Sequence, residues 1–481
     1  MIPDSIPSSL PNRRALGLLL SLLVLSLVVA GFTQGTYDSG DSINHYLFAR
    51  YAFEHPHNFL ESWSKPLVVE LMALPAQLGL RGVMALQCLL VAASAWLSYR
   101  AAHRLALPWP WLAILFCYAS PDYFRIQFSG LTEPLFSTVL MAGVALAVLG
   151  RAGWGAVVLS FLPFARSEGY LLLGVYGLYL VLSRQWRALP WLGLGFFVYG
   201  VAGVFSEYHD FLWAFTHNAY SWRNPAYGSG TAGHFIASLP GTIGLVLFVL
   251  FWLGGLRMLW EWARPEMRHR PGFLAELLLV YGSVVVFIGA HSLFWALGIF
   301  GSFGLTRVLC GIVPLVALVA LRGVLALSQL GKSETVRQRI RIGVVVMVVG
   351  FLFSGARSAF RWQRDFGRAS DQLLADKAVR WAATQPRPPH VVTAHPYFAL
   401  PLGVDPFGAG HSYIRSIRDH QPIPAGTLVF WDDWYAVVEM GVPLNSLRGN
   451  PAYQPLWYGA MPRIRHKPST DSVRMAIFRK L

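Results

Sequence analysis

Two aspartates lie in a short acidic and aromatic segment, residues 37–46, directly after the first long apolar stretch of the chain. Asp38 and Asp41 flank Gly40, and a carboxylate in such a place can remove a proton from an attacking hydroxyl group. We take Asp41 as the candidate base and Asp38 as its competitor, because a single turn can present either one. The alternative is that both are ordinary loop residues. His45 and Tyr46 are candidates for substrate contact.

Three cations are candidates for binding a phosphate group. Arg166 and Arg307 each lie at the outer end of an expected helix, where a guanidinium group can hold phosphate oxygens in fork geometry. Lys65, within Trp63-Ser64-Lys65-Pro66, is the third. An arginine buried in a membrane is costly, which favours a functional role. The alternative is an arginine whose head group reaches the interface.

Glu133 and Glu168 are candidates for substrate binding, and each has a structural alternative. Glu133 precedes Pro134 at an expected helix start, where a carboxylate also complements the helix dipole. Glu168 can instead form an ion pair with Arg166.

The expected outer surface also carries histidines and aromatic residues. The histidines have no spacing typical of a metal site, so a divalent cation is a cofactor that the sequence does not support; they are His45, His217, His234 and His291. Aromatic residues between Trp213 and Tyr227 suit interfacial anchors, with stacking on a sugar as the alternative.

The composition is that of an integral membrane protein, with 55% hydrophobic and 13% charged residues. The formal charge of +15 comes from short clusters of Lys and Arg between apolar runs. These clusters indicate membrane topology and give no support for a nucleic-acid partner. Cys88, Cys117 and Cys310 all lie in apolar runs, which supports neither disulfides nor a Cys-based metal site. The absence of an N-x-Ser/Thr sequon favours a bacterial membrane.

A membrane span needs about 20 mainly apolar residues, and the chain offers roughly eleven candidates. Residues 15–32 follow Arg13-Arg14 and are taken as a retained first helix, with a signal peptide as the alternative. The other candidates are residues 82–104, 105–120, 130–150, 152–165, 169–183, 188–206, 239–256, 274–293, 303–328 and 340–356. The fifth and sixth spans can also be one long tilted helix, but Pro163 and Gly169 favour two.

Basic residues gather on alternate connections, which places the N-terminus in the cytoplasm and the C-terminus outside. They are Arg13, Arg14, Arg100, Arg104, Arg151, Arg184 and Arg187, with the stretches 257–270 and 332–341. The protein is therefore expected in the cell inner membrane, with its site facing the periplasm. Residues 66–80 are apolar but short, and they contain Glu70 and Pro75, which indicates a helix lying at the interface.

Two domains are expected. Residues 1–356 form a helical membrane domain, in which residues 35–81 are an external loop with the interfacial helix. Residues 357–481 form a small external α/β domain: an amphipathic helix over 364–384, a linker over 386–389, and strands over 390–394, 427–431 and 473–478. Asp432 and Asp433 end a strand, in a turn or facing an acceptor.

The order of these motifs resembles the GT-C superfamily of membrane glycosyltransferases, which use polyprenyl-phosphate-linked sugars. The external loop is similar to that of protein O-mannosyltransferase and lipid A aminoarabinose transferase relatives, although Ser42 replaces the Glu of their Gly-Asp-Glu signature. Further similarities are Leu131-Thr132-Glu133-Pro134, Arg166-Ser167-Glu168-Gly169, Thr306-Arg307 with Pro314, and Trp431-Asp432-Asp433.

The resemblance implies transfer of a sugar such as mannose from a polyprenyl-phosphate donor, with inversion, on the periplasmic side. The acceptor, whether protein, lipid or glycan, is not identified by fold. Two other functions stay open: a transporter or flippase of lipid-linked glycans, and a non-catalytic scaffold with the same fold, which the loss of Glu at position 42 suggests.

Overall fold

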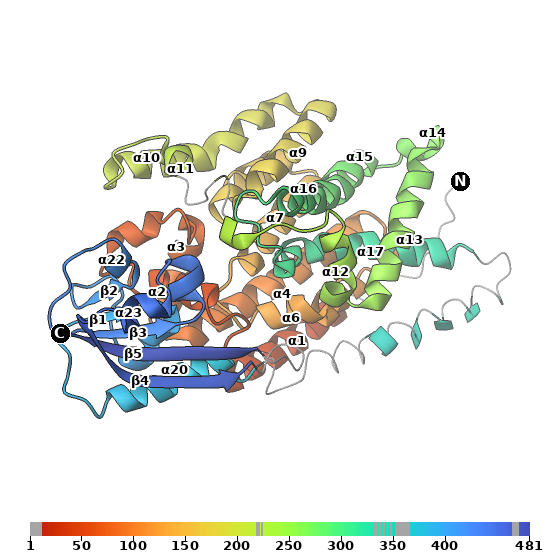
Figure 1. Cartoon of the computed structure of the whole chain (residues 1–481). Helices are drawn as coiled ribbons and strands as arrows, with labels where there is room; N and C mark the ends of the chain where they lie inside the picture. The colour runs from red at the N-terminus through yellow and green to blue at the C-terminus, as the bar shows by residue number, and fades with distance from the viewer. Residues whose placement is uncertain are drawn as a thin grey trace.

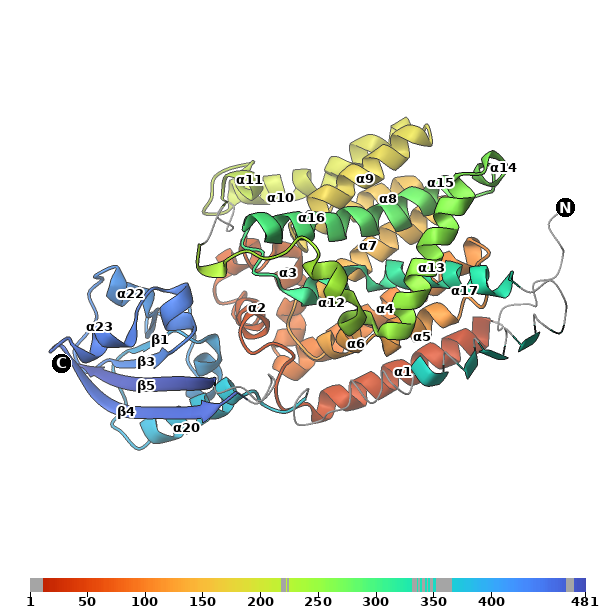
Figure 2. The same ribbon diagram turned by 45° about the vertical axis from the view of Figure 1, so that its right-hand side comes forward.

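The computed structural model describes residues 12–217, 222, 225–330, 335, 338–339, 342–343, 345–346, 349–351, 366–463 and 471–481. A bundle of helices makes up most of the molecule, and a small α/β domain lies at one end of it (Figure 1). The start of α1 (Asn12–Phe32) and the short helix α14 (Pro265–Arg268) lie at the opposite end (Figures 1 and 2).

Six described helical segments are long and apolar enough to cross a membrane. They are Arg13–Phe32 in α1 (Asn12–Phe32), α4 (Leu80–Arg104), Trp186–Phe205 in η3 (Trp186–Gly193) and α10 (Leu194–Phe205), α13 (Leu245–Trp262), Phe273–Leu297 in α15 (Phe273–Ala275), η5 (Glu276–Gly282) and α16 (Ser283–Leu297), and Thr306–Ser328 in η6 (Thr306–Ile312) and α17 (Val313–Ser328). Shorter apolar helices are α3 (Pro66–Ala76), α7 (Glu133–Val148), α8 (Ala152–Leu159) with η2 (Leu162–Phe164), and α9 (Gly169–Leu182). The total of about eleven spans remains a prediction, because residues 340–356 lie largely outside the described residues.

The expected span over residues 105–120 is wrong in its length. Helix α5 runs only over Leu112–Ala119, and α6 (Pro121–Ile126) follows at once. Ala106 and Trp109 both have positive φ, at 51° and 47°, so the chain leaves the helical conformation before α5. Pro121 then disfavours helical backbone at the residue before it. The division of residues 152–183 into two helices is confirmed by α8 and α9.

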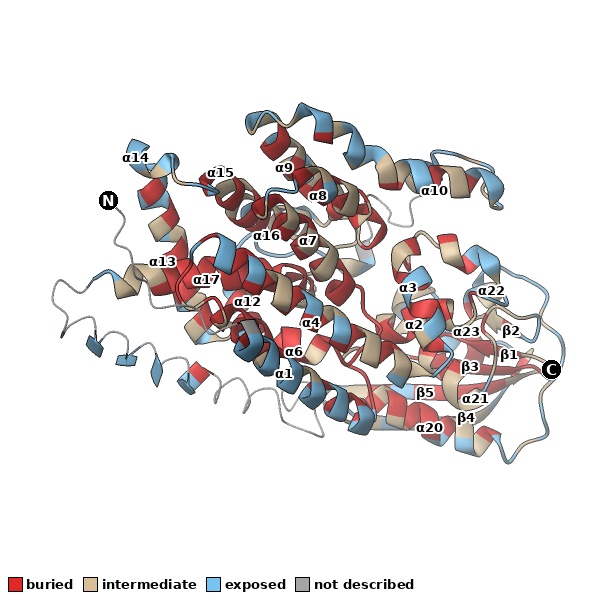
Figure 3. Cartoon of the chain, turned by 180° about the vertical axis from the view of Figure 1, so that it is seen from behind, coloured by how far each residue is buried: buried red, intermediate tan, exposed pale blue. Residues whose placement is uncertain are grey.

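The centre of the bundle is the segment Thr306–Ser328, whose apolar window is 94% buried. Helix α13 crosses α17 closely, because a Cβ on Gly254 would overlap the Val319 carbonyl and one on Gly323 would overlap the Leu250 carbonyl. Small residues of this kind let helix backbones approach each other inside membranes. By contrast, α1 and α13 expose apolar side chains along their outer faces (Figure 3), as helices in contact with lipid do.

The segment after α1 folds into α2 (Asp41–Arg50), η1 (Pro56–Leu60) and α3. Helix α3 buries Val68, Val69 and Met72 but leaves Leu71 and Leu74 exposed. The location of this helix at the membrane interface remains a prediction. Three further short elements lie between α10 and α13 in the chain: α11 (Trp213–Thr216), η4 (Pro225–Tyr227) and α12 (His234–Ile243).

The C-terminal domain contains a five-stranded sheet in the order β2-β1-β3-β5-β4. Strands β1 (Val391–Thr393), β2 (His411–Tyr413) and β3 (Leu428–Asp432) are parallel, and β5 (Ser472–Lys480) pairs antiparallel with β3 and with β4 (Tyr453–Pro462). In register, Phe430 faces Ile477 across β3 and β5. The remaining elements are α20 (Ser370–Ala382), η7 (Pro396–Phe398), α21 (Ala399–Leu402), α22 (Arg415–Arg418), η8 (Tyr435–Glu439) and α23 (Leu444–Arg448).

The C-terminal domain is joined to the bundle next to the end of α1. The Phe366 carbonyl accepts hydrogen bonds from the Gln34 and Gly35 amides, at 2.9 and 3.2 Å. The Phe366 ring packs on Phe128, with centroids 5.3 Å apart. Further out, His55 Nε2 lies 2.7 Å from Asp405 Oδ2. The domain therefore lies beside α2, as Figure 2 shows and as the contact of the Phe407 ring with Phe48 agrees.

Candidate functional site

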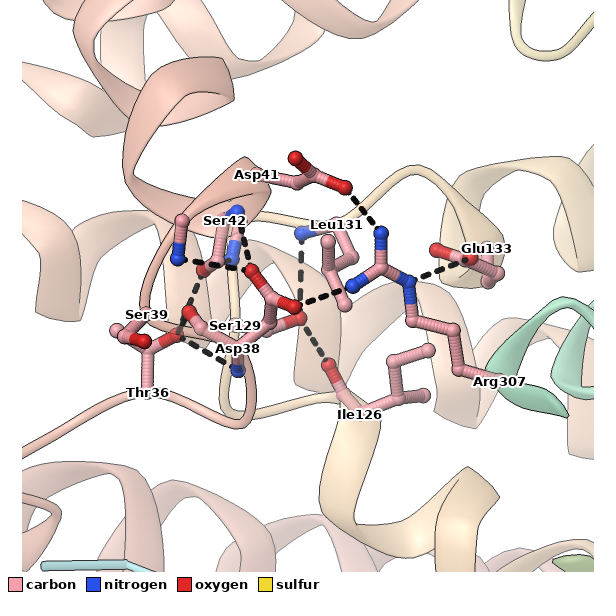
Figure 4. A network of polar contacts seen from close by, with 12 residues as sticks. Thr36, Asp38, Ser39, Asp41, Ser42, Ile126, Ser129, Leu131, Glu133 and Arg307 are labelled. Carbon is pink, nitrogen blue, oxygen red and sulfur yellow. Dashed lines mark hydrogen bonds and ion pairs between the residues drawn. The ribbon is translucent and has the colours of Figure 1, made fainter. Parts of the chain in front are cut away.

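The loop before α2 is shaped by Asp38. Its Oδ1 accepts hydrogen bonds from the Gly40 amide at 2.9 Å and the Ser42 amide at 3.4 Å, so the carboxylate satisfies amides at the start of α2 (Figure 4). Ser42, where the resembled signature has Glu, accepts a hydrogen bond from the Gly130 amide at 2.6 Å. The short side chain thus ties α2 to the loop that precedes α7.

Arg307 gathers three carboxylates around one guanidinium group (Figure 4). Its Nη1 contacts Asp38 Oδ2 and its Nη2 contacts Asp41 Oδ2. Its Nε lies 3.6 Å from Glu133 Oε1. The structure therefore brings together four of the residues that the sequence singled out, from three separate parts of the chain.

Arg166 extends this network in the direction of α9 and α16. Its Nη1 lies 2.9 Å from Glu133 Oε1 and donates to Thr132 Oγ1 at 2.8 Å, and its Nη2 donates to Glu168 Oε1 at 2.7 Å. The same Glu168 oxygen lies 3.1 Å from His291 Nε2. Burial alone would raise the pKa of Glu168, but Arg166 and His291 hold it well below its ordinary value. Glu168 is therefore an ionised carboxylate.

Glu133 is the most enclosed carboxylate of the network, with a side chain only 1% exposed. It lies in the first turn of α7, as expected from its position before Pro134. Within the described part of the chain, neither of its oxygens accepts a hydrogen bond of good geometry. Arg166 and Arg307 both form ion pairs with Oε1, so Oε2 is a buried acceptor open to a donor such as a sugar hydroxyl.

The two aspartates differ in how many of their carboxylate oxygens form hydrogen bonds and in how exposed their side chains are. Both Asp38 oxygens accept hydrogen bonds, Oδ1 from the Gly40 and Ser42 amides and Oδ2 from Arg307. Asp41 contacts Arg307 through Oδ2, and its side chain is 34% exposed, compared with 27% for Asp38. Partial burial raises the pKa of Asp41 above its ordinary value against the opposing charge of Arg307, and the charge of Asp38 adds to the rise.

Lys65 and His45 lie beside the arginines. Burial and the charge of Arg166 lower the pKa of Lys65 to about 8, while Glu168 acts in the opposite direction. Burial and the charges of Arg307 and Arg166 lower the pKa of His45 to about 3, so its imidazole is neutral. His45 stacks on Trp63 with centroids 4.6 Å apart, and its Nδ1 lies 2.9 Å from Ser64 Oγ.

Other candidates lie outside the network. Tyr46 packs in the apolar core of the bundle. Trp213 is 1% exposed and donates to the Tyr199 carbonyl at 2.7 Å, so it is a core residue and not an interfacial anchor, whereas Trp222 is exposed. Residues 218–221 and 223–224 lie outside the described residues. Asp432 closes a strand-terminal turn by accepting from the Trp434 and Tyr435 amides.

The sequence did not single out several residues of the site. Thr132 was part of a motif, and His291 was weighed only for a metal site. Four further residues lie at or next to the loop 38–41, which we call the reactive loop because it carries the candidate base. They are Ser39 of the loop itself and Asp371, His395 and Tyr435 of the C-terminal domain. Over the described residues, no group of three or more His, Cys, Asp or Glu side chains is arranged to hold a metal ion.

No protein-family model matches this chain, and no curated protein matches it in sequence. Its fold is similar to that of solved structures. ArnT from Cupriavidus metallidurans, a lipid A aminoarabinose transferase, superimposes in its apo state with a TM-score of 0.61 and 14% identity, over 96% of this chain and 98% of that one. The same protein bound to undecaprenyl phosphate gives a TM-score of 0.58 and 13% identity, over 96% and 97%.

The oligosaccharyltransferase of Archaeoglobus fulgidus, in its apo form, superimposes with a TM-score of 0.53 and 10% identity, over 92% of this chain and 73% of that one. The fold of this chain is therefore that of GT-C-like membrane glycosyltransferases, as the sequence motifs predicted. Together with the six apolar helices, it makes the chain an integral membrane protein.

Proposed function

We propose that this protein is a membrane glycosyltransferase that moves a sugar from a polyprenyl-phosphate donor to an acceptor hydroxyl on the periplasmic side. The observation that carries the proposal is the network of Asp41, Arg307, Glu133, Arg166 and Glu168 within a GT-C-like fold. It places a partly exposed carboxylate next to partly buried cations, which is what transfer away from a phosphate requires. The binding of undecaprenyl phosphate by ArnT supports the choice of donor.

The proposed reaction is a direct displacement at the anomeric carbon. The acceptor oxygen forms a bond to that carbon while the bond from the carbon to the phosphate oxygen breaks, so the sugar inverts and the phosphate leaves with the electron pair. Asp41 takes the proton of the acceptor hydroxyl. Its raised pKa and greater exposure favour it over Asp38, whose oxygens are engaged in shaping the loop.

The cations stabilise the charge that develops on the departing phosphate. Arg307, Arg166 and Lys65 are the proposed phosphate-binding residues, because guanidinium and ammonium groups donate charge-assisted hydrogen bonds to phosphate oxygens. Glu133, Glu168 and the neutral His45 are proposed to contact the donor sugar or the acceptor. The open acceptor atom, Glu133 Oε2, supports this role most directly.

Substitution of the base tests the proposal. We expect Asp41→Asn to lower transfer from labelled polyprenyl-phosphate sugars by about 10²–10⁴-fold, because the amide cannot accept the proton. Binding of undecaprenyl phosphate should persist, since the amide keeps the shape of the side chain. Asp419→Asn, at an exposed aspartate of the C-terminal domain, is the matched control and should transfer normally.

The outcomes separate the functions that the sequence left open. Normal transfer by the Asp41→Asn protein would remove this residue from the mechanism. Binding of polyprenyl-phosphate sugars by the wild-type protein without any transfer would contradict the enzyme and favour a transporter or a non-catalytic scaffold.

A further inference from the structure

Tyr435 belongs to the C-terminal domain but lies against the reactive loop of the membrane domain. A Cβ built on Gly40 would overlap the Tyr435 hydroxyl and would lie 2.7 Å from Tyr435 Cζ. Gly40 itself has φ −106°, which any residue can adopt. The glycine is therefore required by the space that Tyr435 occupies, and not by the conformation of the backbone.

A second contact joins the same loop to the same domain. Ser39 Oγ donates a hydrogen bond to Asp371 Oδ2, and His395 Nε2 lies 3.0 Å from that oxygen. His395 Nδ1 accepts from the Tyr397 amide at 3.1 Å, so the ring presents a proton on Nε2 to Asp371. His395 is only 2% exposed, and its ring meets the Tyr435 ring edge-on with centroids 4.8 Å apart. The two contacts are thus parts of one packed cluster.

Tyr435 is itself fixed by the strand that precedes it. Asp432, the last residue of β3, accepts from the Tyr435 amide at 2.7 Å and from the Trp434 amide at 2.9 Å. Burial, followed by the charges of Asp41, Asp38, Asp371 and Asp432, raises the pKa of Tyr435 well above its ordinary value. The phenol keeps its proton, so a neutral hydroxyl faces the carboxylates without adding to their charge.

We propose that the C-terminal domain positions the loop 38–41 for transfer through two contacts, Tyr435 on Gly40 and the Asp371–His395 pair on Ser39. This inference rests on the proposed function, because it concerns the geometry of the proposed base. Tyr435, Asp371 and His395 are positioning residues: Tyr435 contacts Gly40, Asp371 contacts Ser39, and His395 acts through Asp371, while Asp41 directly follows Gly40. The site is then complete only when the C-terminal domain is docked.

A double-mutant cycle between Gly40 and Tyr435 tests the contact. Gly40→Ala should lower kcat by about tenfold or more, because the added methyl group must displace Tyr435 or the loop. In a Tyr435→Leu background the same substitution should lower kcat by much less, since the shorter side chain leaves room for the methyl group. A tenfold coupling corresponds to about 1.4 kcal/mol.

The controls separate positioning from loss of folding. Gly233→Ala, at a glycine with open space around it, and Tyr458→Leu, at an exposed tyrosine in β4 of the same domain as Tyr435, should leave kcat unchanged. Ser39→Ala removes a single hydroxyl and should lower kcat several-fold, by analogy with the loss of one hydrogen bond. Undecaprenyl phosphate should bind Ser39→Ala and Gly40→Ala as tightly as wild type.

The inference is overturned if Gly40→Ala lowers kcat by the same factor in the wild-type and Tyr435→Leu proteins. It is also overturned if Ser39→Ala transfers at the wild-type rate. Equal weakening of lipid binding and transfer would also overturn it, because that pattern indicates general distortion of the site. Absence of transfer by the wild-type protein is a different result, which contradicts the proposed function itself.

Discussion

At Arg307 a single guanidinium group contacts the carboxylates of Asp38, Asp41 and Glu133. One positive charge cannot neutralise three negative ones, and the additional charge of Arg166 is shared with Glu168. A phosphate that enters this network must therefore compete with carboxylates for the guanidinium groups. Under the proposed function, the competition frees Asp41 from Arg307 as the donor binds, so that binding of the donor prepares the base.

Lys65 supplies a cation whose charge depends on pH in the working range. Its φ of 72° is rare for a residue with a side chain, and it directly precedes Pro66 at the start of α3. Because the pKa of Lys65 is lowered to about 8, its ammonium group is present below that pH and is lost above it.

We expect the affinity of the wild-type protein for undecaprenyl phosphate to fall by about tenfold as the pH rises through about 8, because one charged contact to the phosphate disappears. Lys65→Arg should remove this step, since a guanidinium group stays charged. Lys377→Arg, at an exposed lysine on α20, is the control and should show the same fall in affinity near pH 8 as the wild-type protein. A wild-type affinity that is constant from pH 7 to 9.5 would exclude Lys65 from phosphate binding.

The residues of the site differed in how far the sequence could identify them. Arg166, Glu133 and Arg307 each stand in a short motif at the end of an apolar run, where a charge is costly and therefore informative. Tyr435 and Asp371 carry no such signal, because neither stands in a charged motif at the end of a membrane span and both lie more than 330 residues from the loop that they touch. Their role depends on how two domains dock, which no local pattern encodes.

At the scale of elements, the helices that hold the site are themselves held by close backbone packing. Arg307 lies at the start of the segment that continues into α17, and α17 packs on α13 through Gly323 and Gly254. A methyl group at either glycine would meet backbone atoms of the other helix, which cannot rotate away. The position of Arg307 therefore depends on this crossing.

Gly254→Ala should reduce the free energy of unfolding by about 1–3 kcal/mol, as overpacking of a tight interior does. Gly255→Ala is the matched control on the same helix, because a Cβ there meets nothing within 4 Å. The melting temperature of the purified protein in detergent should fall for Gly254→Ala and stay near or above that of wild type for Gly255→Ala. Equal melting temperatures for the two variants would show that α13 and α17 can move apart without a loss of stability.

Most helices and strands could be predicted from apolar runs and from the Pro and Gly residues that end them. The elements that could not be predicted have identifiable causes. The expected span over residues 105–120 failed because a short apolar run between two prolines contains one helix of only eight residues. Strand β2 has three residues, too few for a pattern, and β4 contains Pro455 and Pro462, which are unusual in strands. The strands β1, β3 and β5 were expected because each forms a compact apolar run.

At the scale of the whole molecule, the C-terminal domain lies at one end of the bundle, and the start of α1 and α14 lie at the other (Figure 2). The distribution of basic residues predicts that Arg13-Arg14 and the stretch 257–270, which includes α14, lie on the cytoplasmic side. The proposed site, at the end that carries the C-terminal domain, would then face the periplasm.

Single cysteines test this orientation with little background, because Cys88, Cys117 and Cys310 are all buried. In spheroplasts, a maleimide that cannot cross membranes should label Ser446→Cys, at an exposed position of α23. It should label Glu266→Cys, in exposed α14, only after the membrane is permeabilised, and this substitution leaves the basic residues of the stretch intact. The opposite labelling pattern would invert the proposed topology.

The hydrogen bonds from the Gln34 and Gly35 amides to the Phe366 carbonyl have a consequence for biogenesis. During synthesis the first helix and its external loop emerge from the ribosome hundreds of residues before Phe366. Under the proposed topology, this loop is therefore exported before the residues that bind it have been synthesised and have crossed the membrane. A chain terminated between Arg307 and Phe366 would carry Asp41 and both arginines but would lack these two hydrogen bonds and the C-terminal domain. If that domain positions the loop 38–41 as we propose, such an unfinished chain is expected to transfer poorly.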